Sequence, residues 1–219
     1  AESIQSILNQ GVKNIELIIV NDCSTDGSKD IIDFYAAKDD RIKVIGLKVN
    51  GGMSNARNTG NKTAKAPIIA VQDADDISMP ERAGKIIRFF DKHPKTDLFY
   101  SAFTLIDEHN NPNVTYAAEK FNIQNVYDKK VTMIGHPSMA YKKKVILKHP
   151  YKGGEFSRLG FEDFRLITEL WKTKHKFGFI DESLVLYRWH TKNSSQTRDS
   201  QLVNKIKDKY IKKYLKGAK

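Results

Sequence analysis

The 219-residue chain has only one cysteine, Cys23, so it cannot form a disulfide bond within itself. A chain without disulfides fits a reducing compartment, and we expect a cytoplasmic protein. Long apolar runs are also missing, since none approaches the roughly 18 residues of a membrane-spanning helix. No basic stretch followed by an apolar one marks a signal peptide at the start. Internal repeats, low-complexity tracts and Pro/Gly-rich linkers are absent too, so the sequence predicts a single domain over 1–219.

Acidic residues are outnumbered by basic ones, 26 to 37, which gives a net charge of +11. The stretch Lys129–Lys152 holds seven lysines and no acid, and Thr191–Lys219 holds nine basic residues against two acidic ones. Such stretches attract polyanions, namely nucleic acid, anionic lipid headgroups or an acidic glycan. For any single lysine, a solvated surface position is the simpler interpretation.

Segments with strand and helix patterns alternate along the first half of the chain. We expect strands at 16–20, 41–47, 67–71, 97–104 and 176–187, and helices at 3–10, 28–37, 54–64, 80–93, 164–174 and 202–215. This alternation predicts an α/β fold with a mostly parallel central sheet flanked by helices. A parallel α/β domain ordinarily opens with a strand, whereas this chain opens inside a helix. We therefore expect that the first strand of the sheet is missing.

Three carboxylates, Asp73, Asp75 and Asp76, follow the apolar strand predicted at 67–71. Ligands bind at the carboxyl ends of strands in open α/β sheets. Residues two apart on an extended chain point the same way, so Asp73 and Asp75 can face one site. Clustered carboxylates repel one another unless a cation neutralises them, and Mg²⁺ or Mn²⁺ with a phosphorylated substrate does so. The alternative is an acidic loop whose aspartates cap the helix that begins near Pro80.

A second polar cluster, Asn21, Asp22 and Ser24, follows the strand predicted at 16–20. The Asp22 carboxylate could accept a hydrogen bond from a nucleobase N–H, and Ser24 could bond to phosphate or ribose oxygens. An Asx-type turn with a helix N-cap explains the residues at 26–28. It explains Asn21 and Asp22 less well, because two polar groups there are more than a turn requires.

Two further groups carry chemistry in the second half of the chain. The acidic pair Glu162 and Asp163 introduces the helix at 164–174, where the helix dipole alone would favour carboxylates. His190 closes the run Tyr187-Arg188-Trp189-His190 after the last predicted strand. A lone histidine is more often structural than a ligand, although a neutral imidazole is a competent Mn²⁺ ligand.

In this order the motifs resemble those of family 2 glycosyltransferases. That family carries a strand ending in (N/D)DxSxDxS, an NxGxxxARNxG-like segment, a strand ending in DxDD before a proline, an (E/D)D pair before a helix and a C-terminal YRxH element. The matching segments here are 21–28, 50–52 with 56–60, 73–76, 162–163 and 187–190. The resemblance runs from residue 3 to about 195. It implies a GT-A fold, which is Rossmann-like, and an inverting transfer of a sugar from a nucleotide-sugar donor, foremost a UDP-sugar.

On the donor side, the resemblance assigns roles to residues within 1–103, the nucleotide-sugar-binding half. Asp22 would bind the uracil or another base, with Ser24 beside it. Asp73 would lie near the ribose and the metal ion. Arg57 would lie near the donor, where a cation suits a diphosphate. A salt bridge on a helix face is the alternative role for Arg57.

For metal and catalysis, the resemblance implies Mn²⁺ or Mg²⁺ held by Asp75, with His190 on the metal or the diphosphate. Asp163 would be the catalytic base that removes the proton from the acceptor hydroxyl. Glu162 would orient the acceptor or cap the helix. His136 falls where such enzymes line the acceptor side, within the acceptor and catalytic half at 104–195.

The C-terminal segment 196–219 is predicted to be a basic amphipathic helix. The apolar residues Val203, Ile206, Tyr210 and Tyr214 recur at helical spacing, with lysines on the other face. This pattern suits peripheral contact with an anionic membrane surface, where lipid-linked acceptors would be found. It suits equally well a helix packed on the domain or leading into a further one.

Two other classes of protein share some of these features. A sugar-phosphate nucleotidyltransferase would have a similar α/β core and an acidic metal site, but its Gly-rich phosphate loop would fall in a region that this chain lacks. A basic module that binds glycan or nucleic acid would account for the charge. Nucleic acid is the less favoured partner, because the aspartate cluster would face phosphates of like charge.

Overall fold

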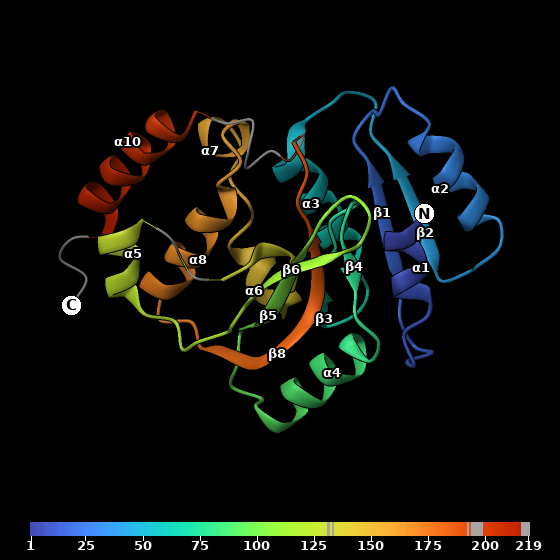
Figure 1. Ribbon diagram of the computed structural model, residues 1–219, viewed down its shortest axis with the longest axis horizontal. Coiled ribbons are helices and arrows are strands. Elements are labelled where there is room, and N and C mark those ends of the chain that lie inside the picture. The colour runs from blue at the N-terminus through green and yellow to red at the C-terminus, as the bar shows by residue number, and fades with distance from the viewer. Residues whose placement is uncertain (131, 133, 192, 194–198, 216–219) are drawn as a thin grey trace.

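The computed structural model describes residues 1–219 except 131, 133, 192, 194–198 and 216–219. The helices are α1 (Glu2–Leu8), α2 (Ser28–Ala36), α3 (Gly52–Thr63), α4 (Arg82–Lys92), α5 (Ile123–Lys129), α6 (Lys143–Lys148), α7 (Glu155–Arg158), α8 (Glu162–Lys172) and α10 (Ser200–Tyr210), with the short turns η1 (His136–Ser138) and η2 (Ile211–Leu215). The strands are β1 (Leu17–Asn21), β2 (Ile42–Gly46), β3 (Ile68–Ala70), β4 (Ile77–Ser78), β5 (Leu98–Ile106), β6 (Pro112–Tyr116), β7 (Ala140–Lys142) and β8 (Phe177–Arg188). Every helix and strand expected from the sequence is present, which confirms the α/β class (Figure 1).

The strands form two sheets, and the larger one is mixed. β1 and β2 pair in parallel, whereas the six-stranded sheet has the order β3-β7-β5-β8-β4 with β6 on β5. Only β5 and β8 run parallel there, and the other pairs are antiparallel. The prediction of a mostly parallel sheet is therefore wrong. The antiparallel pairs are formed with β4, β6 and β7, short strands in segments for which the sequence predicted no strand.

The core lies on both faces of the β5–β8 pair. Leu98 and Tyr100 face Ile167 and Leu170 of α8, whereas Phe99, one position along, faces the opposite side, where α4 packs. Successive side chains of a strand point to opposite faces, so a strand with helices on both sides is apolar along most of its length, as β5 is. β8 is apolar toward both of its ends, with the exposed Asp181 and Glu182 between them.

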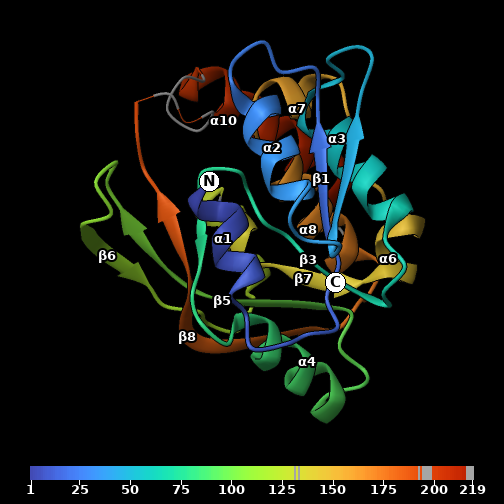
Figure 2. The same cartoon turned by 90° about the vertical axis from the view of Figure 1, so that its right-hand side faces the viewer.

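The β1–β2 pair stands apart from the larger sheet (Figure 2). The side chains of β1 are only half-buried, and β1 and β3 line the same cavity of about 2000 Å³. β3 ends the hydrogen-bonded order of the larger sheet, and β1 is bonded to β2 alone. An extended segment between these two edges could bond to both of them. The arrangement suits the expected additional strand, which stays a prediction.

The C-terminal helix packs against the domain at the end opposite to β1 and β2 (Figure 1). Val203, Tyr210 and Ile211 are buried in one cluster with Val126 of α5 and Phe164 of α8. The residues predicted at 196–198 and 216–219 lie outside those described. No helix in the described part of the chain has both the length and the apolar character needed to cross a membrane.

Candidate active site

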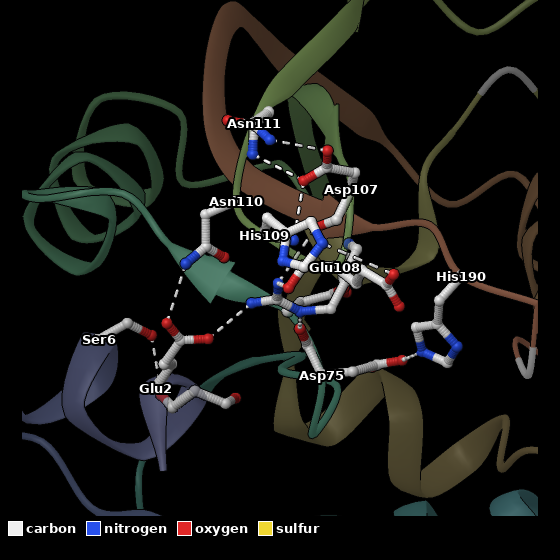
Figure 3. A network of polar contacts seen from close by, with 12 residues as sticks. Glu2, Ser6, Asp75, Asp107, Glu108, His109, Asn110, Asn111 and His190 are labelled. Atoms are coloured by element: carbon white, nitrogen blue, oxygen red, sulfur yellow. Dashed lines mark hydrogen bonds and ion pairs between the residues drawn. The ribbon is translucent and has the colours of Figure 1, made fainter.

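Asp75 and His190 meet at one point although 115 residues separate them. The His190 Nε2 atom lies 3.1 Å from Asp75 Oδ2 (Figure 3). The Asn193 amide nitrogen lies 3.5 Å from the same oxygen. Asp75 follows β3 and His190 follows β8, so the two side chains come from the ends of two strands of one sheet. The structure thus brings together two of the three residues that the sequence assigns to a metal.

Arg188 fixes the loop that carries Asp75. Its backbone N–H donates to Asp76 Oδ1 at 2.9 Å, and its Nε donates to the Asp75 carbonyl at 2.9 Å. Its guanidinium also donates to the Asp107 carbonyl at 3.2 Å and to Glu2 Oε2 at 2.8 Å, and Figure 3 labels these two partners. Arg188 therefore joins the backbone of the acidic loop, the β5–β6 turn and α1 at the end of β8. Sequence reasoning assigned no role to Arg188.

Asp76 is the third carboxylate of the acidic motif, and it is fully buried. Burial, together with the nearby charge of Asp73, raises the pKa of the Asp76 carboxyl to about 8. Burial lowers the pKa of the neighbouring Arg82 guanidinium to about 10. Because Asp76 holds the end of β8 through Arg188, we interpret it as a structural anchor of the loop rather than a ligand.

Asp73 faces Arg57 instead of joining Asp75 and His190. Arg57 donates to Asp73 Oδ1 at 3.1 Å and to the buried carboxylate of Glu162. Burial acts to raise the pKa of the Asp73 carboxyl, but the Arg57 guanidinium outweighs it and holds the pKa well below its usual range. Burial raises the pKa of Glu162, with Arg57 opposing it. Arg57 is thus a bridge between Asp73 and the start of α8, and the donor and metal roles of Asp73 stay predictions.

Replacing Arg57 by lysine is expected to lower the free energy of unfolding by about 1–3 kcal/mol. A lysine keeps the positive charge, but it cannot donate in two directions to Asp73 and Glu162 as the planar guanidinium does. Urea denaturation measures the effect, with the exposed Arg88→Lys as the matched control. Equal stability of the two variants would contradict the bridging role.

His136, predicted on the acceptor side, lies against Asp73. Its Nε2 contacts the Tyr151 hydroxyl at 2.9 Å, and its Nδ1 is 3.7 Å from Asp73 Oδ2. His136 is buried in η1, the turn before β7. If the Tyr151 hydroxyl donates its hydrogen bond to Nε2, the ring proton of a neutral His136 lies on Nδ1 and faces the Asp73 carboxylate. The contact partners of His136 therefore come from both predicted halves of the chain, Asp73 from 1–103 and Tyr151 from 104–195, and its acceptor role stays a prediction.

Asp163 lies at the first turn of α8, beside the buried Glu162. Its Oδ1 accepts a hydrogen bond from the Phe164 N–H at 2.7 Å, and the side chain is partly exposed. Gly160, with φ of +63°, makes the turn that brings the chain into this helix, a conformation that favours glycine. Asp163 lines the same cavity as Asp75, so the predicted base and the predicted metal ligand face one space.

The loop after β1 contacts the loop before α3. Asp22 Oδ1 accepts a hydrogen bond from the Gly51 N–H at 2.8 Å, and Asn21 Oδ1 accepts one from the Ser24 N–H at 2.9 Å. Ser24 and Arg57 line the cavity that also holds Asp75. Asp22 and Ser24 thus lie in a loop that is bonded to the loop before α3, whereas Arg57 lies within α3 and Asp73 follows β3.

Comparison with known proteins agrees with this geometry. The family description "Glycosyl transferase family 2" matches residues 1–149. Among curated relatives, the chain is 33% identical over 190 residues to the uncharacterized glycosyltransferase MJ1057 of Methanocaldococcus jannaschii, covering 85% of this chain and 64% of that protein. It is 32% identical over 199 residues to the minor teichoic acid biosynthesis protein GgaB of Bacillus subtilis, covering 89% of this chain and 22% of that one.

Solved structures resemble the fold. Staphylococcus aureus TarS 1-349 in complex with UDP superposes with a TM-score of 0.67 at 19% identity, over 87% of this chain and 56% of that one. The mannosyltransferase PcManGT from Pyrobaculum calidifontis, in complex with GDP-Man and Mn2+, gives 0.65 at 12% identity, over 88% and 54%. The chain spans less than two thirds of the length of each of these proteins. The expected GT-A fold is confirmed, and the chain belongs to glycosyl transferase family 2.

Proposed function

We propose that the protein transfers a sugar from a nucleotide-sugar, foremost a UDP-sugar, to a hydroxyl of a glycan or lipid-linked acceptor during synthesis of a surface polysaccharide. The observation that carries this proposal is the single cavity lined by Asp75, Asp163 and Arg57. It combines a metal-binding carboxylate, a carboxylate at a helix start and a cation. GgaB is named for teichoic acid biosynthesis, and TarS was solved with UDP, which supports the polymer class and the donor class.

The donor set fits a Mn²⁺ or Mg²⁺ ion that takes part of its coordination from the substrate. Asp75 and His190 present one oxygen and one nitrogen 3.1 Å apart. The described residues contain no group of three or more His, Cys, Asp or Glu side chains suited to hold a metal. Such ions commonly use one or two protein ligands together with substrate phosphates and water. When bound, the ion stabilises the charge that develops on the departing diphosphate.

Asp163 is the general base of this proposal. It occupies the start of α8 on the wall of the cavity, and the neighbouring Glu162 is held by Arg57. The Asp163 carboxylate accepts the proton of the acceptor hydroxyl as that oxygen bonds to the anomeric carbon and the diphosphate departs. A single displacement from the side opposite the leaving group inverts the anomeric configuration.

Asp22→Asn is expected to weaken binding of the nucleotide about 5- to 100-fold, the equivalent of one hydrogen bond to a base N–H with a charged acceptor. The asparagine oxygen can still accept from the Gly51 N–H. Calorimetric titration with UDP measures the change. Asp26→Asn, at a nearby turn where the carboxylate accepts from the Ser28 N–H, is the control and should bind UDP like the wild type.

The rival function is sugar-phosphate nucleotidyl transfer. The two are separated by their products. A glycosyltransferase incubated with a panel of sugar nucleotides and Mn²⁺ releases UDP or GDP, and this is the expected result. A nucleotidyltransferase would instead form pyrophosphate from a nucleoside triphosphate and a sugar phosphate, and that product would overturn the proposal.

The membrane part of the proposal concerns the outer face of the C-terminal helix. The exposed residues Lys205, Lys209, Lys212 and Lys213 share this face, whereas the apolar face is buried in the domain. Contact with an anionic membrane would therefore be electrostatic rather than insertional. It would place the protein on the cytoplasmic face of the membrane, close to lipid-linked acceptors.

Replacing these four lysines by glutamine is expected to abolish co-sedimentation with anionic liposomes, because each basic residue near the surface contributes about 1 kcal/mol. This variant is preferable to deletion from Leu202, which would expose the buried cluster around Tyr210. If the glutamine variant co-sedimented with anionic liposomes as much as the wild type does, the proposed membrane contact would be contradicted.

A further inference from the structure

Two histidines, His149 and His175, face each other outside the cavity that holds Asp75. Their Nε2 atoms are 3.2 Å apart, with the ring planes nearly perpendicular. His149 directly follows α6 and is 8% exposed, and His175 lies in the turn between α8 and β8. Backbone hydrogen bonds hold both residues, from the His149 N–H to the Val145 carbonyl and from the His175 N–H to the Leu170 carbonyl. The pair is thus fixed by the backbone at the edge of the core.

Each ring has a carboxylate next to its Nδ1 atom. His149 Nδ1 lies 3.2 Å from Glu169 Oε1, and His175 Nδ1 lies 3.0 Å from Asp97 Oδ2. The Lys142 ammonium is 3.8 Å from the other Asp97 oxygen. An imidazole nitrogen next to a carboxylate carries the ring proton, so both protons belong on the Nδ1 atoms.

This arrangement directs two nitrogen lone pairs at each other. With Nδ1 protonated, a neutral imidazole has an unshared pair on Nε2, and two such pairs 3.2 Å apart repel. A positive charge between His149 and His175 removes the repulsion. The ring centroids are 5.0 Å apart, closer than two rings joined end to end through this contact would be. The two lone pairs therefore do not both lie along the line that joins the Nε2 atoms.

We propose that His149 and His175 form a binding site for a divalent transition-metal ion of the Zn²⁺ class, through their Nε2 atoms. Two nitrogens at about 2.0–2.1 Å from a tetrahedral zinc ion lie about 3.3–3.4 Å apart. The observed 3.2 Å requires almost no movement. Carboxylates behind the ligating histidines are the usual outer partners of such sites.

The site differs in ligand chemistry from the one around Asp75. Two imidazoles favour Zn²⁺, Ni²⁺ or Cu²⁺, whereas the Asp75 site pairs one imidazole with a carboxylate oxygen, the ligand type that Mg²⁺ and Mn²⁺ prefer. The described residues add no third His, Cys, Asp or Glu ligand to the pair, so water completes the coordination. The side chains are 10% and 19% exposed, which gives the ion access from solvent. The ion would cross-link the end of α6 to the end of α8, the helix that carries Asp163 in its first turn.

The test uses the whole chain, stripped with a chelator and dialysed against Zn²⁺ in excess Mg²⁺. Any zinc that binds at Asp75 and His190 is common to all the variants, so it cancels in the comparison. His149→Gln and His175→Gln are each expected to bind one zinc equivalent fewer than the wild type, whereas the exposed His93→Gln should bind as many. Zn²⁺ should raise the Tm of the wild type and of His93→Gln, but not of the other two variants. Co²⁺ in place of Zn²⁺ should give the visible absorption of a four-coordinate ion only when both histidines are present.

A further variant changes a carboxylate behind the site and keeps both histidine ligands. Glu169→Gln should weaken Zn²⁺ binding about 10- to 100-fold, while the variant still binds as many zinc ions as the wild type. Equal zinc content in wild type and His175→Gln would overturn the proposal. So would nitrogen NMR that shows a proton shared between the two Nε2 atoms in the presence of Zn²⁺, because the charge between the rings would then be a proton.

Discussion

Asp163→Asn is expected to lower kcat about 10²- to 10⁴-fold and to leave the donor KM nearly unchanged. Asparagine has the shape of aspartate, and its oxygen can still accept from the Phe164 N–H. It cannot take up the proton of the acceptor hydroxyl. The loss therefore falls on the chemical step, and steady-state rates of nucleoside diphosphate release in the presence of acceptor measure it.

The neighbouring Glu162 provides an internal contrast. Its carboxylate is buried and bonded to Arg57, so Glu162→Gln should reduce stability more than it reduces the chemical step. The exposed Asp128→Asn serves as the distant control and should behave like the wild type. If Asp163→Asn kept wild-type kcat within a few-fold, while Glu162→Gln lost it, the catalytic base would have to be reassigned to Glu162.

Asp75→Asn is expected to lower metal-dependent turnover about 10³-fold, the equivalent of the several kcal/mol that a metal ion contributes to a developing charge. The amide loses the negative charge that holds the ion, yet it can keep its contact with His190 Nε2. Titration with Mn²⁺ should show a half-saturating concentration far above that of the wild type.

His190→Gln should shift the Mn²⁺ titration in the same direction, because His190 faces the same oxygen of Asp75. The exposed Asp91→Asn on α4 is the control and should leave the titration unchanged. A wild-type Mn²⁺ dependence in Asp75→Asn would show that the ion binds elsewhere.

The meeting of Asp75 with His190 followed from the sequence in large part. Both residues come directly after apolar strands, and polar residues at strand ends gather at the ligand-binding edge of an α/β sheet. The apolar segments of β3, β5 and β8 were recognisable in the sequence. The order of the motifs then indicated that segments distant along the chain contribute to one site.

The support of the site was beyond sequence reasoning. Arg188 reaches Glu2 and the turn at 107–111, and neither segment carries a motif or a periodic pattern. The strands β4, β6 and β7 were not predicted, so the antiparallel pairs that they form were missed as well. The contact of His136 with Asp73 was not foreseen either, because it depends on how η1 folds back beside β3.

The His149–His175 pair shows the same limit. The two residues are 26 apart and belong to no recognisable spacing, and their carboxylate partners lie at the end of α8 and ahead of β5. Only the packing of α6 and α8 against the sheet brings the four side chains together.

The measurement that tests the central claim most directly is nucleoside diphosphate release from a panel of sugar nucleotides, with and without Mn²⁺. The assay compares the wild type, Asp163→Asn, Asp75→Asn and Asp91→Asn. Family 2 sugar transfer at this site predicts Mn²⁺-dependent release of UDP or GDP by the wild type and Asp91→Asn, and its near-complete loss in the other two variants. Release that is equal in all four proteins, or pyrophosphate as the product from nucleoside triphosphate and sugar phosphate, would contradict it.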